Sequence, residues 1–149
     1  VGINGKTVYG SRDIGIVADL ELGEMDLTKL EGIVLPGGLG GVASIKASQP
    51  ALDAVKFAYE NHKLVAAICA GPTVLAMLGI TDGKRATCYP GCEEQMGNAL
   101  MVPDAAAVTD GNLTTGTSAG CAIPFALQLI TALKGQEAAD EVARQIVIR

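Results

Sequence analysis

The sequence predicts one α/β domain, a three-layer sandwich in which helices cover both faces of a mainly parallel sheet. Short apolar runs alternate with helical segments along the 149 residues, an order that is typical of parallel sheets. Hydrophobic residues make up 49% of the chain and aromatic residues only 3%, a composition that suits strands buried on both faces. Charged residues make up 18%, too few for a disordered chain. Residues 1–149 show no repeat or linker, so we expect a single domain.

The expected strands are short and are bounded by turn residues. Asp110-Gly111 is a hairpin signal between two of them, and Asn4-Gly5 is the turn signal near the start of the chain. The run 64–69 is rich in β-branched residues and alanine, whereas the alanines before Asp110 are weak strand formers. The expected strand segments are the end of a strand within 1–10, then 14–19, 32–35, 64–69, 85–88, 106–109 and 112–115.

The expected helices carry recognisable end signals. Ser48 is a serine cap with Pro50 in the first turn that follows it. Pro124 belongs in the first turn of a later helix, because a deeper proline would cost about 3 kcal/mol. Gly135 closes that helix. The expected helices run from Ser48 to about His62, over 71–78, over 123–134 and, on the surface, over 137–145.

Charge and composition exclude several function classes. The net charge is −5 and no lysine or arginine cluster occurs, so nucleic-acid binding has no electrostatic footprint. No apolar run approaches the roughly 20 residues of a membrane span. The four cysteines make neither a disulfide framework nor a zinc pattern. We therefore expect a cytoplasmic protein without metal or cofactor.

Cys69 is the candidate nucleophile. The apolar run Leu64–Ile68 stops at this cysteine, and Ala70-Gly71-Pro72 then opens a helix. A nucleophile at a strand-to-helix corner is lifted out of the sheet on a sharp turn. The helix N-terminus favours negative charge there, and the thiolate is the reactive form of cysteine. The alternative is an inert core thiol, since free cysteine is often buried.

A glycine-rich loop provides the candidate anion pocket. Pro36-Gly37-Gly38 follows the predicted strand 32–35, and glycine allows the backbone to expose its amides. The loop could be only a tight turn. The functional alternative is that the amides of Gly38 and Ala70 hold a developing oxyanion next to Cys69.

These motifs resemble those of the ThiJ/PfpI family, also called the DJ-one superfamily, and most closely its DJ-one-like branch. The likeness spans essentially the whole chain. Its most specific part is the cysteine corner preceded by the glycine loop. The segments that carry it are Ser11–Asp13, Leu35–Gly38, Ala67–Pro72, Arg85–Pro90, Asp110–Thr115 and Phe125–Leu127. The resemblance implies a flavodoxin-like fold, a homodimer, and a reactive, oxidation-sensitive cysteine at the position of Cys69.

The resemblance also implies a partner that this sequence does not place. In the family, a glutamate on a helix near the N-terminus hydrogen-bonds the cysteine, after a first strand that precedes that helix. This chain resembles the family from just after that point. About 35 residues would be missing, and we expect them to be supplied, for example as a separate N-terminal fragment of the same protein, because a buried strand edge would otherwise stay open.

Other positions depart from the family pattern. Many members have histidine where Tyr89 stands, and the peptidase branch has histidine where Ala70 stands, so a Cys-His peptidase is disfavoured. The single histidine, His62, precedes the cysteine strand at its far end. Arg12 matches an arginine that lies near the dimer interface and cysteine pocket in relatives. The alternative for Arg12 is a solvated charge.

The resulting hypothesis is a cysteine-dependent enzyme that acts on small 2-oxoaldehydes such as methylglyoxal. Cys69 would attack the aldehyde carbon, with Gly37, Gly38, Ala70, Tyr89 and Arg12 around the substrate. The resemblance implies cofactor-independent glyoxalase III or deglycase activity, in protection against carbonyl and oxidative stress. One alternative is a redox sensor or chaperone-like stress protein that works through oxidation of Cys69. A binding module without catalysis is the other.

Overall fold

A central four-stranded sheet organises the molecule. The computed structural model describes residues 1–148. The sheet has the order β3-β4-β8-β7, in which β3, β4 and β8 are parallel and β7 is antiparallel to β8. Two small two-stranded sheets, β1-β2 and β5-β6, lie outside it. The strands are β1 (Thr7–Tyr9), β2 (Gly15–Val17), β3 (Gly32–Leu35), β4 (Leu64–Ile68), β5 (Arg85–Ala86), β6 (Leu100–Met101), β7 (Ala107–Asp110) and β8 (Leu113–Gly116).

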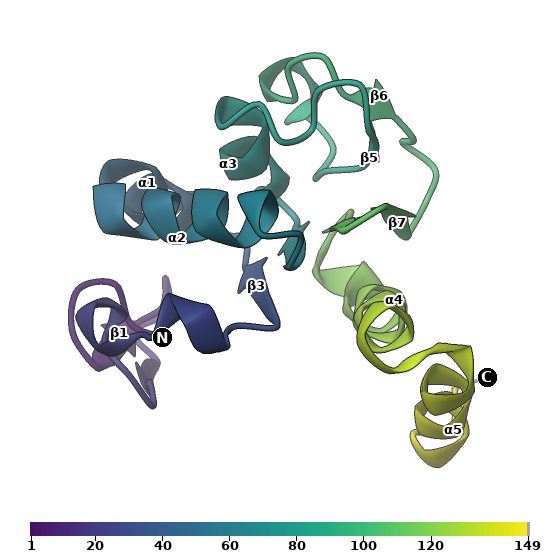
Figure 1. The fold of residues 1–149 in the computed structure, drawn as a ribbon, viewed down its shortest axis with the longest axis horizontal. Helices are drawn as coiled ribbons and strands as arrows, with labels where there is room; N and C mark the ends of the chain where they lie inside the picture. The colour runs from purple at the N-terminus through teal and green to yellow at the C-terminus, as the bar shows by residue number, and fades with distance from the viewer. Residues whose placement is uncertain (149) are drawn as a thin grey trace.

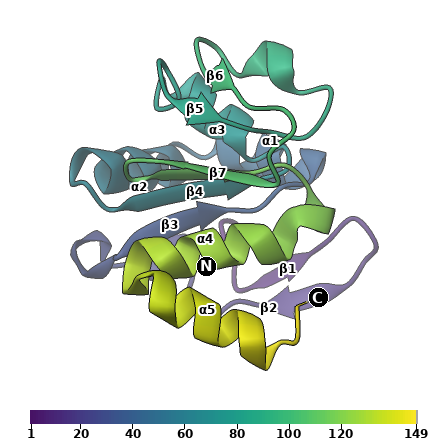
Figure 2. The ribbon, with the colours of Figure 1, turned by 90° about the vertical axis from the view of Figure 1, so that its right-hand side faces the viewer.

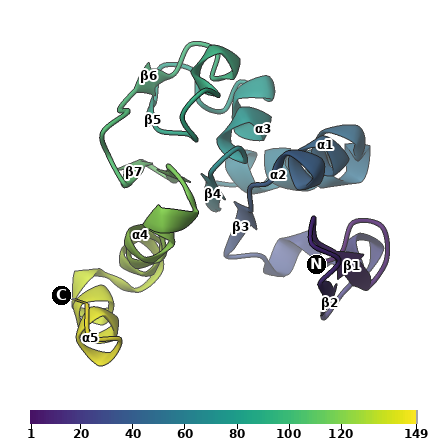
Figure 3. The same ribbon diagram turned by 180° about the vertical axis from the view of Figure 1, so that it is seen from behind.

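Helices cover both faces of this sheet. In Figures 1 and 3, α1, α2 and α3 lie on one side of the strands, and α4 and α5 lie on the other. Figure 2 shows α4 and α5 lying side by side across the strands. The predicted three-layer α/β sandwich is therefore confirmed. The helices are α1 (Leu39–Ala47), α2 (Gln49–Glu60), α3 (Pro72–Met77), α4 (Ala122–Lys134) and α5 (Gln136–Gln145).

Strand β4 lies in the middle of the parallel ladder. Its register pairs Leu35 with Ala67 on one side and Gly116 with Ile68 on the other. The carboxyl ends of β3, β4 and β8 therefore meet at one edge of the sheet. In open α/β sheets this edge is where ligands bind, and Cys69 follows β4 there.

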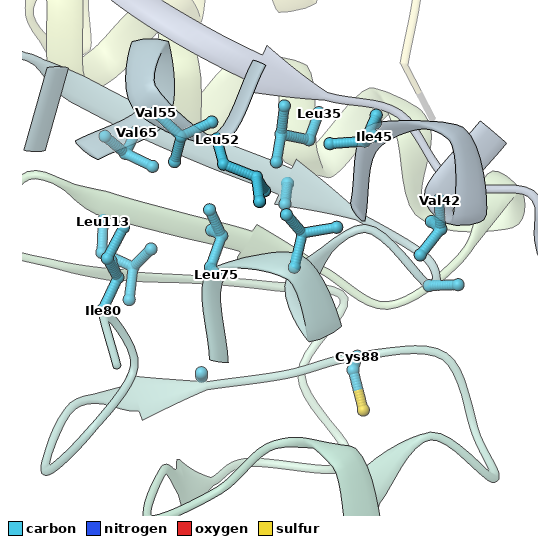
Figure 4. Close-up of a cluster of buried hydrophobic side chains, with 14 of the residues drawn as sticks. Leu35, Val42, Ile45, Leu52, Val55, Val65, Leu75, Ile80, Cys88 and Leu113 are labelled. Atoms are coloured by element: carbon cyan, nitrogen blue, oxygen red, sulfur yellow. The ribbon is translucent and has the colours of Figure 1, made fainter. Parts of the chain in front are cut away.

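The hydrophobic core fills the space between the sheet and helices α1 to α3. Figure 4 shows Leu35, Val55, Val65 and Leu75 among the side chains that meet there. Three successive residues of β4, from Val65 to Ala67, are 0% exposed. Their small size lets helices lie close to both faces of the strand.

Three helices have the predicted end signals. The Ser48 side chain accepts a hydrogen bond from the Ala51 amide at the start of α2, which confirms the cap. Pro72 begins α3, and Pro124 lies in the first turn of α4. Gly135 ends α4 with φ = 89°, a backbone angle that suits glycine.

Some expectations were wrong in detail. Helix α1 was not predicted, because Gly40 and Gly41 are poor helix formers. The turn of the first hairpin lies at 10–14 rather than at Asn4-Gly5, which precedes β1. The strand expected over 85–88 ends at Ala86. Among residues 1–148, no helix combines the length and apolar character needed to cross a bilayer.

Candidate active site

The backbone of Cys69 adopts a left-handed conformation at the corner between β4 and α3. Its φ angle is 65°, a value that is uncommon for residues other than glycine. The residue follows the last residue of β4, and α3 begins three positions later at Pro72. The side chain is partly buried. The structure thus places Cys69 on the sharp turn that the sequence predicts.

Two backbone hydrogen bonds fix this turn. The Cys69 amide donates to the Gly116 carbonyl at 2.9 Å, and the Cys69 carbonyl accepts from the Tyr89 amide at 2.8 Å. The two partners come from different parts of the chain, the end of β8 and the segment after β5. Sequence reasoning did not identify Gly116, because its role comes from strand register rather than from a motif.

Glycines make the corner sterically possible. A Cβ atom at Gly37 would lie 2.5 Å from the Cys69 Cβ and 3.0 Å from its sulfur. A Cβ atom at Gly71 would meet the Leu35 carbonyl oxygen at 2.8 Å. Contacts this short do not occur between real side chains and backbone. The glycine loop and the cysteine corner therefore touch, as expected for one site.

The two predicted oxyanion donors flank this contact. Gly38 has φ = 83° and precedes α1, while Ala70 follows Cys69 and is 4% exposed. Within the part of the chain that the structure describes, neither amide donates a hydrogen bond to another residue. Ala70 is buried, whereas Gly38 is exposed. Because a buried backbone amide normally has a partner, the Ala70 amide in particular is available to an anion or to water.

Helix α3, which follows the Cys69 corner, is slightly shorter than predicted. It has only six residues, fewer than two turns. A helix dipole depends on aligned peptide units and acts within the first turn. Helix α3 therefore contributes at most the amides of its first turn to a negative charge at the Cys69 corner.

Of the two other predicted site residues, Tyr89 is bonded to Cys69 through its backbone, whereas Arg12 takes no part in the hydrogen bonds of the site. Tyr89 contributes its amide to the Cys69 carbonyl, and its side chain is 48% exposed. Arg12 is exposed on the β1-β2 turn. Among residues 1–148, no hydrogen bond or ion pair joins Arg12 to Cys69. In Figures 1 and 3 its hairpin lies apart from α3.

The remaining cysteines lie in two environments. Cys88 and Cys92 are buried, at 4% and 7% exposure. Figure 4 shows the Cys88 sulfur pointing away from Val42 and Leu75. Burial, with Glu93 and Cys92 nearby, raises the pKa of Cys88 to about 11, which disfavours its thiolate. Cys121 is partly buried at the cap of α4, and the Ser118 hydroxyl donates to its sulfur at 3.7 Å.

The described residues give Cys69 no acid–base partner. No side chain within 1–148 forms a hydrogen bond with its sulfur. His62 comes before β4, and Cys69 comes after it, so a seven-residue extended path of about 23 Å separates them. Within the same residues, no cluster of three or more metal-ligating side chains occurs.

Comparison with known proteins identifies the family. Residues 1–132 match the model of the DJ-1/PfpI family. The chain belongs to the DJ-1/PfpI family. It is 40% identical to Protein dj-1beta of Drosophila melanogaster over 149 residues, which cover 99% of this chain and 80% of that relative. This family includes cysteine-dependent enzymes, which agrees with the cysteine corner described above.

Solved structures of family members have the same fold. The crystal structure of Drosophila melanogaster DJ-1beta superposes with a TM-score of 0.93 at 39% identity, over 99% of this chain and 81% of that one. An oxidised Toxoplasma gondii DJ-1 superposes with a TM-score of 0.89 at 28% identity, over 97% and 79%. These matches confirm the predicted flavodoxin-like α/β architecture and the DJ-one-like branch.

Proposed function

We propose that this protein is a cysteine-dependent enzyme that converts small 2-oxoaldehydes, such as methylglyoxal, to hydroxy acids without a cofactor. The observation that carries the proposal is the Cys69 corner. A partly buried thiol on a left-handed turn lies against Gly37, beside two amides, of Gly38 and Ala70, that have no acceptor within residues 1–148. A nucleophile beside preorganised donors is the arrangement that acyl and carbonyl chemistry requires.

The proposed reaction is balanced without an added oxidant or reductant. The Cys69 thiolate forms a carbon–sulfur bond with the aldehyde carbon, and the carbonyl oxygen becomes an alkoxide near the amides of Gly38 and Ala70. A base then moves the hydrogen of the aldehyde carbon, as a proton, to the neighbouring ketone carbon. This step leaves a thioester, which water cleaves to release the hydroxy acid and the free thiol.

The proton transfer needs a base that residues 1–148 do not place at Cys69. We propose a glutamate on an additional strand-and-helix segment that docks beside β3. Two features support this assignment. Within residues 1–148, strand β3 pairs only with β4 and has an open edge, and α4, an apolar helix, buries only Phe125. Intact-mass measurement of the native protein would show whether a second fragment accompanies this chain.

The test is formation of D-lactate from methylglyoxal without glutathione. We expect Cys69→Ser to abolish turnover by the protein, since the serine hydroxyl is a much weaker nucleophile. Cys121→Ser is the matched control, because Cys121 is also partly buried and begins a helix. Full turnover by Cys69→Ser would exclude the assigned nucleophile.

A second candidate function is redox sensing through Cys69. Its specific support is that the similar Toxoplasma gondii DJ-1 structure is of an oxidised protein. The amides of Gly38 and Ala70 would stabilise a sulfinate as they would an alkoxide. A mild peroxide titration followed by peptide mass spectrometry tests this function. Oxidation of Cys88 or Cys121 before Cys69 would refute it.

We also propose a homodimer. The β1-β2 hairpin is a two-stranded ribbon exposed along both strands, and such ribbons are marginal alone. It presents Tyr9, Ile14, Ile16 and Val17, which are 65–75% exposed. Exposed apolar side chains in a group are typical of an interface.

A further inference from the structure

The left-handed backbone of Cys69 depends on support from outside its own strand and helix. Non-glycine residues hold such a conformation only where surrounding contacts determine it. Here the contacts are the hydrogen bonds to the Gly116 carbonyl and from the Tyr89 amide. The position of the sulfur therefore depends on how firmly these two partners are held.

The segment that carries Tyr89 has little backbone support of its own. Strand β5 ends at Ala86 and, among the described strands, pairs only with β6, outside the main sheet. Arg85 is anchored by its amide, which donates to the Asp110 carboxylate at 2.8 Å. Between this anchor and Tyr89, the Ala86 carbonyl accepts from the Val102 amide at 2.9 Å, and the next fixed point is Thr87, which is 0% exposed.

Two threonines, Thr115 at the end of β8 and Thr117 just after it, hold this fixed point. The Thr87 amide donates to the Thr115 hydroxyl at 2.9 Å. The Thr87 hydroxyl lies 2.9 Å from the Thr117 hydroxyl, and the Thr117 hydroxyl donates to the Ala105 carbonyl. A hydroxyl has one hydrogen, so Thr117 accepts from Thr87, and the direction of both bonds is determined.

These bonds close a ring through Cys69. Thr115 and Thr117 flank Gly116, whose carbonyl accepts from the Cys69 amide. The same three-residue stretch thus holds Cys69 directly and, through Thr87, holds the segment whose Tyr89 amide donates to Cys69. Loss of one hydroxyl would loosen both supports together.

We propose that Thr87, Thr115 and Thr117 are positioning residues for the Cys69 thiol. They act through the backbone and do not touch the reacting atoms. The inference rests on the proposed function in one respect, that the position of Cys69 is what makes the thiol reactive. It assigns a role to the threonine-rich end of β8, which neither the fold nor the proposed chemistry otherwise explains.

The test measures the rate of Cys69 alkylation by iodoacetamide in the folded protein, relative to Cys121 in the same molecules, by peptide mass spectrometry. Thr117→Val keeps the shape and removes the hydroxyl. We expect it to lower the Cys69/Cys121 ratio about tenfold, because the sulfur moves away from the amides of Gly38 and Ala70. Thr117→Ser keeps the hydroxyl and should retain the wild-type ratio. Thr117→Ala removes the same hydroxyl with less steric demand and should reproduce the effect if the valine variant does not fold.

Thr81→Val is the matched control for general destabilisation. Thr81 is also 0% exposed, and its hydroxyl donates to the Met96 carbonyl, but within residues 1–148 no hydrogen bond joins its side chain to Thr87, Thr115, Thr117 or Cys69. Mere loosening of the fold would raise alkylation of all thiols, including buried Cys88, whereas loss of positioning lowers that of Cys69 alone. An unchanged ratio in the folded hydroxyl-free variants, or an equal fall in Thr117→Ser, would overturn the inference. The readout is independent of turnover: a lowered ratio in a protein without aldehyde turnover would refute the proposed function and support this inference.

Discussion

The contact between Cys69 and Gly37 decides whether the site can exist. Gly37 leaves room for the cysteine side chain, which would otherwise lie 2.5 Å from a Cβ atom at that position. The left-handed turn at Cys69 aims the thiol at this glycine loop rather than into the core. At the residue scale, the chemistry therefore depends as much on the absence of a side chain as on the thiol.

Gly37→Ala is expected to displace the Cys69 side chain. The added methyl group meets both the Cβ and the sulfur, and a misplacement of about 1 Å can lower turnover about a hundredfold. Gly40→Ala is the matched control, because a Cβ there has no neighbour within 4 Å and alanine favours helix α1. Aldehyde turnover measures the effect, and equal activity of the two variants would contradict the proposed contact.

The buried thiol of Cys88 predicts a pH dependence of stability. Burial raises the pKa of Cys88 from 9.0 to about 11, so the unfolded chain releases this proton before the folded protein does. The contribution of Cys88 to stability therefore falls as pH rises from about 9 to about 11 and is constant below that window. Cys88→Ala should remove this part of the decline. Chemical unfolding at pH 8 and pH 11 checks it, and parallel declines for both proteins would argue against a buried Cys88 thiol.

The corner between β4 and α3 was predictable because its signals are local. An apolar run ends at Cys69, and Gly71-Pro72 immediately starts a helix. The hydrogen bonds among Thr87, Thr115 and Thr117 were not predictable, because Thr87 and Thr117 are 30 positions apart and meet only in the folded protein. The proposed acid–base partner of Cys69 lies outside the described residues, and only the resemblance to the family suggested it.

At the scale of elements, the start of helix α2 was easier to predict from the sequence than helix α1, which precedes it. Helix α2 begins at the serine cap and proline that announce it. Helix α1 lies between the glycine loop and that cap. Its two glycines lower the helix propensity of the segment, so the sequence does not predict a helix there. Val42 and Ile45 are its buried residues, so tertiary packing rather than propensity accounts for α1.

Ser48→Ala is expected to destabilise the protein by about 1 kcal/mol, because it removes the cap that accepts the Ala51 amide. Ser44→Ala is the matched control within the preceding helix. Its exposed hydroxyl bonds the Gly40 carbonyl one turn back, an interaction that alanine replaces at little or no cost. Urea unfolding measures both, and equal effects would show that the cap contributes nothing specific.

At the scale of the whole molecule, the parallel strands bring the site together and leave two surfaces open. The ends of β3, β4 and β8 meet at one edge and juxtapose the glycine loop, Cys69 and Gly116. The open edge of β3 and the exposed β1-β2 hairpin are not part of the sheet edge that carries the site. Their distinct positions fit two different partners, the proposed additional segment and a second copy of the chain.

The hairpin predicts the dimer surface. Ile16→Glu places a charge on the exposed strand β2, where the isoleucine is 65% exposed, and should weaken dimerisation at least about tenfold. Leu100→Glu changes a similarly exposed residue, at 58%, in β6 of the separate β5-β6 sheet. It should leave the dimer intact. Sedimentation equilibrium measures the dimer dissociation constant of each variant. If Leu100→Glu weakens the dimer and Ile16→Glu does not, the interface lies elsewhere than on the hairpin.

The central claim is that the fold makes Cys69 the reactive thiol of this protein. The most direct measurement is the alkylation rate of each of the four cysteines in the native protein at neutral pH. Cys88 and Cys92 are buried, whereas Cys121 is partly buried and begins a helix like Cys69. The account predicts that Cys69 reacts first, about tenfold or more ahead of Cys121. Equal rates for these two thiols, or faster reaction of Cys121, would contradict it.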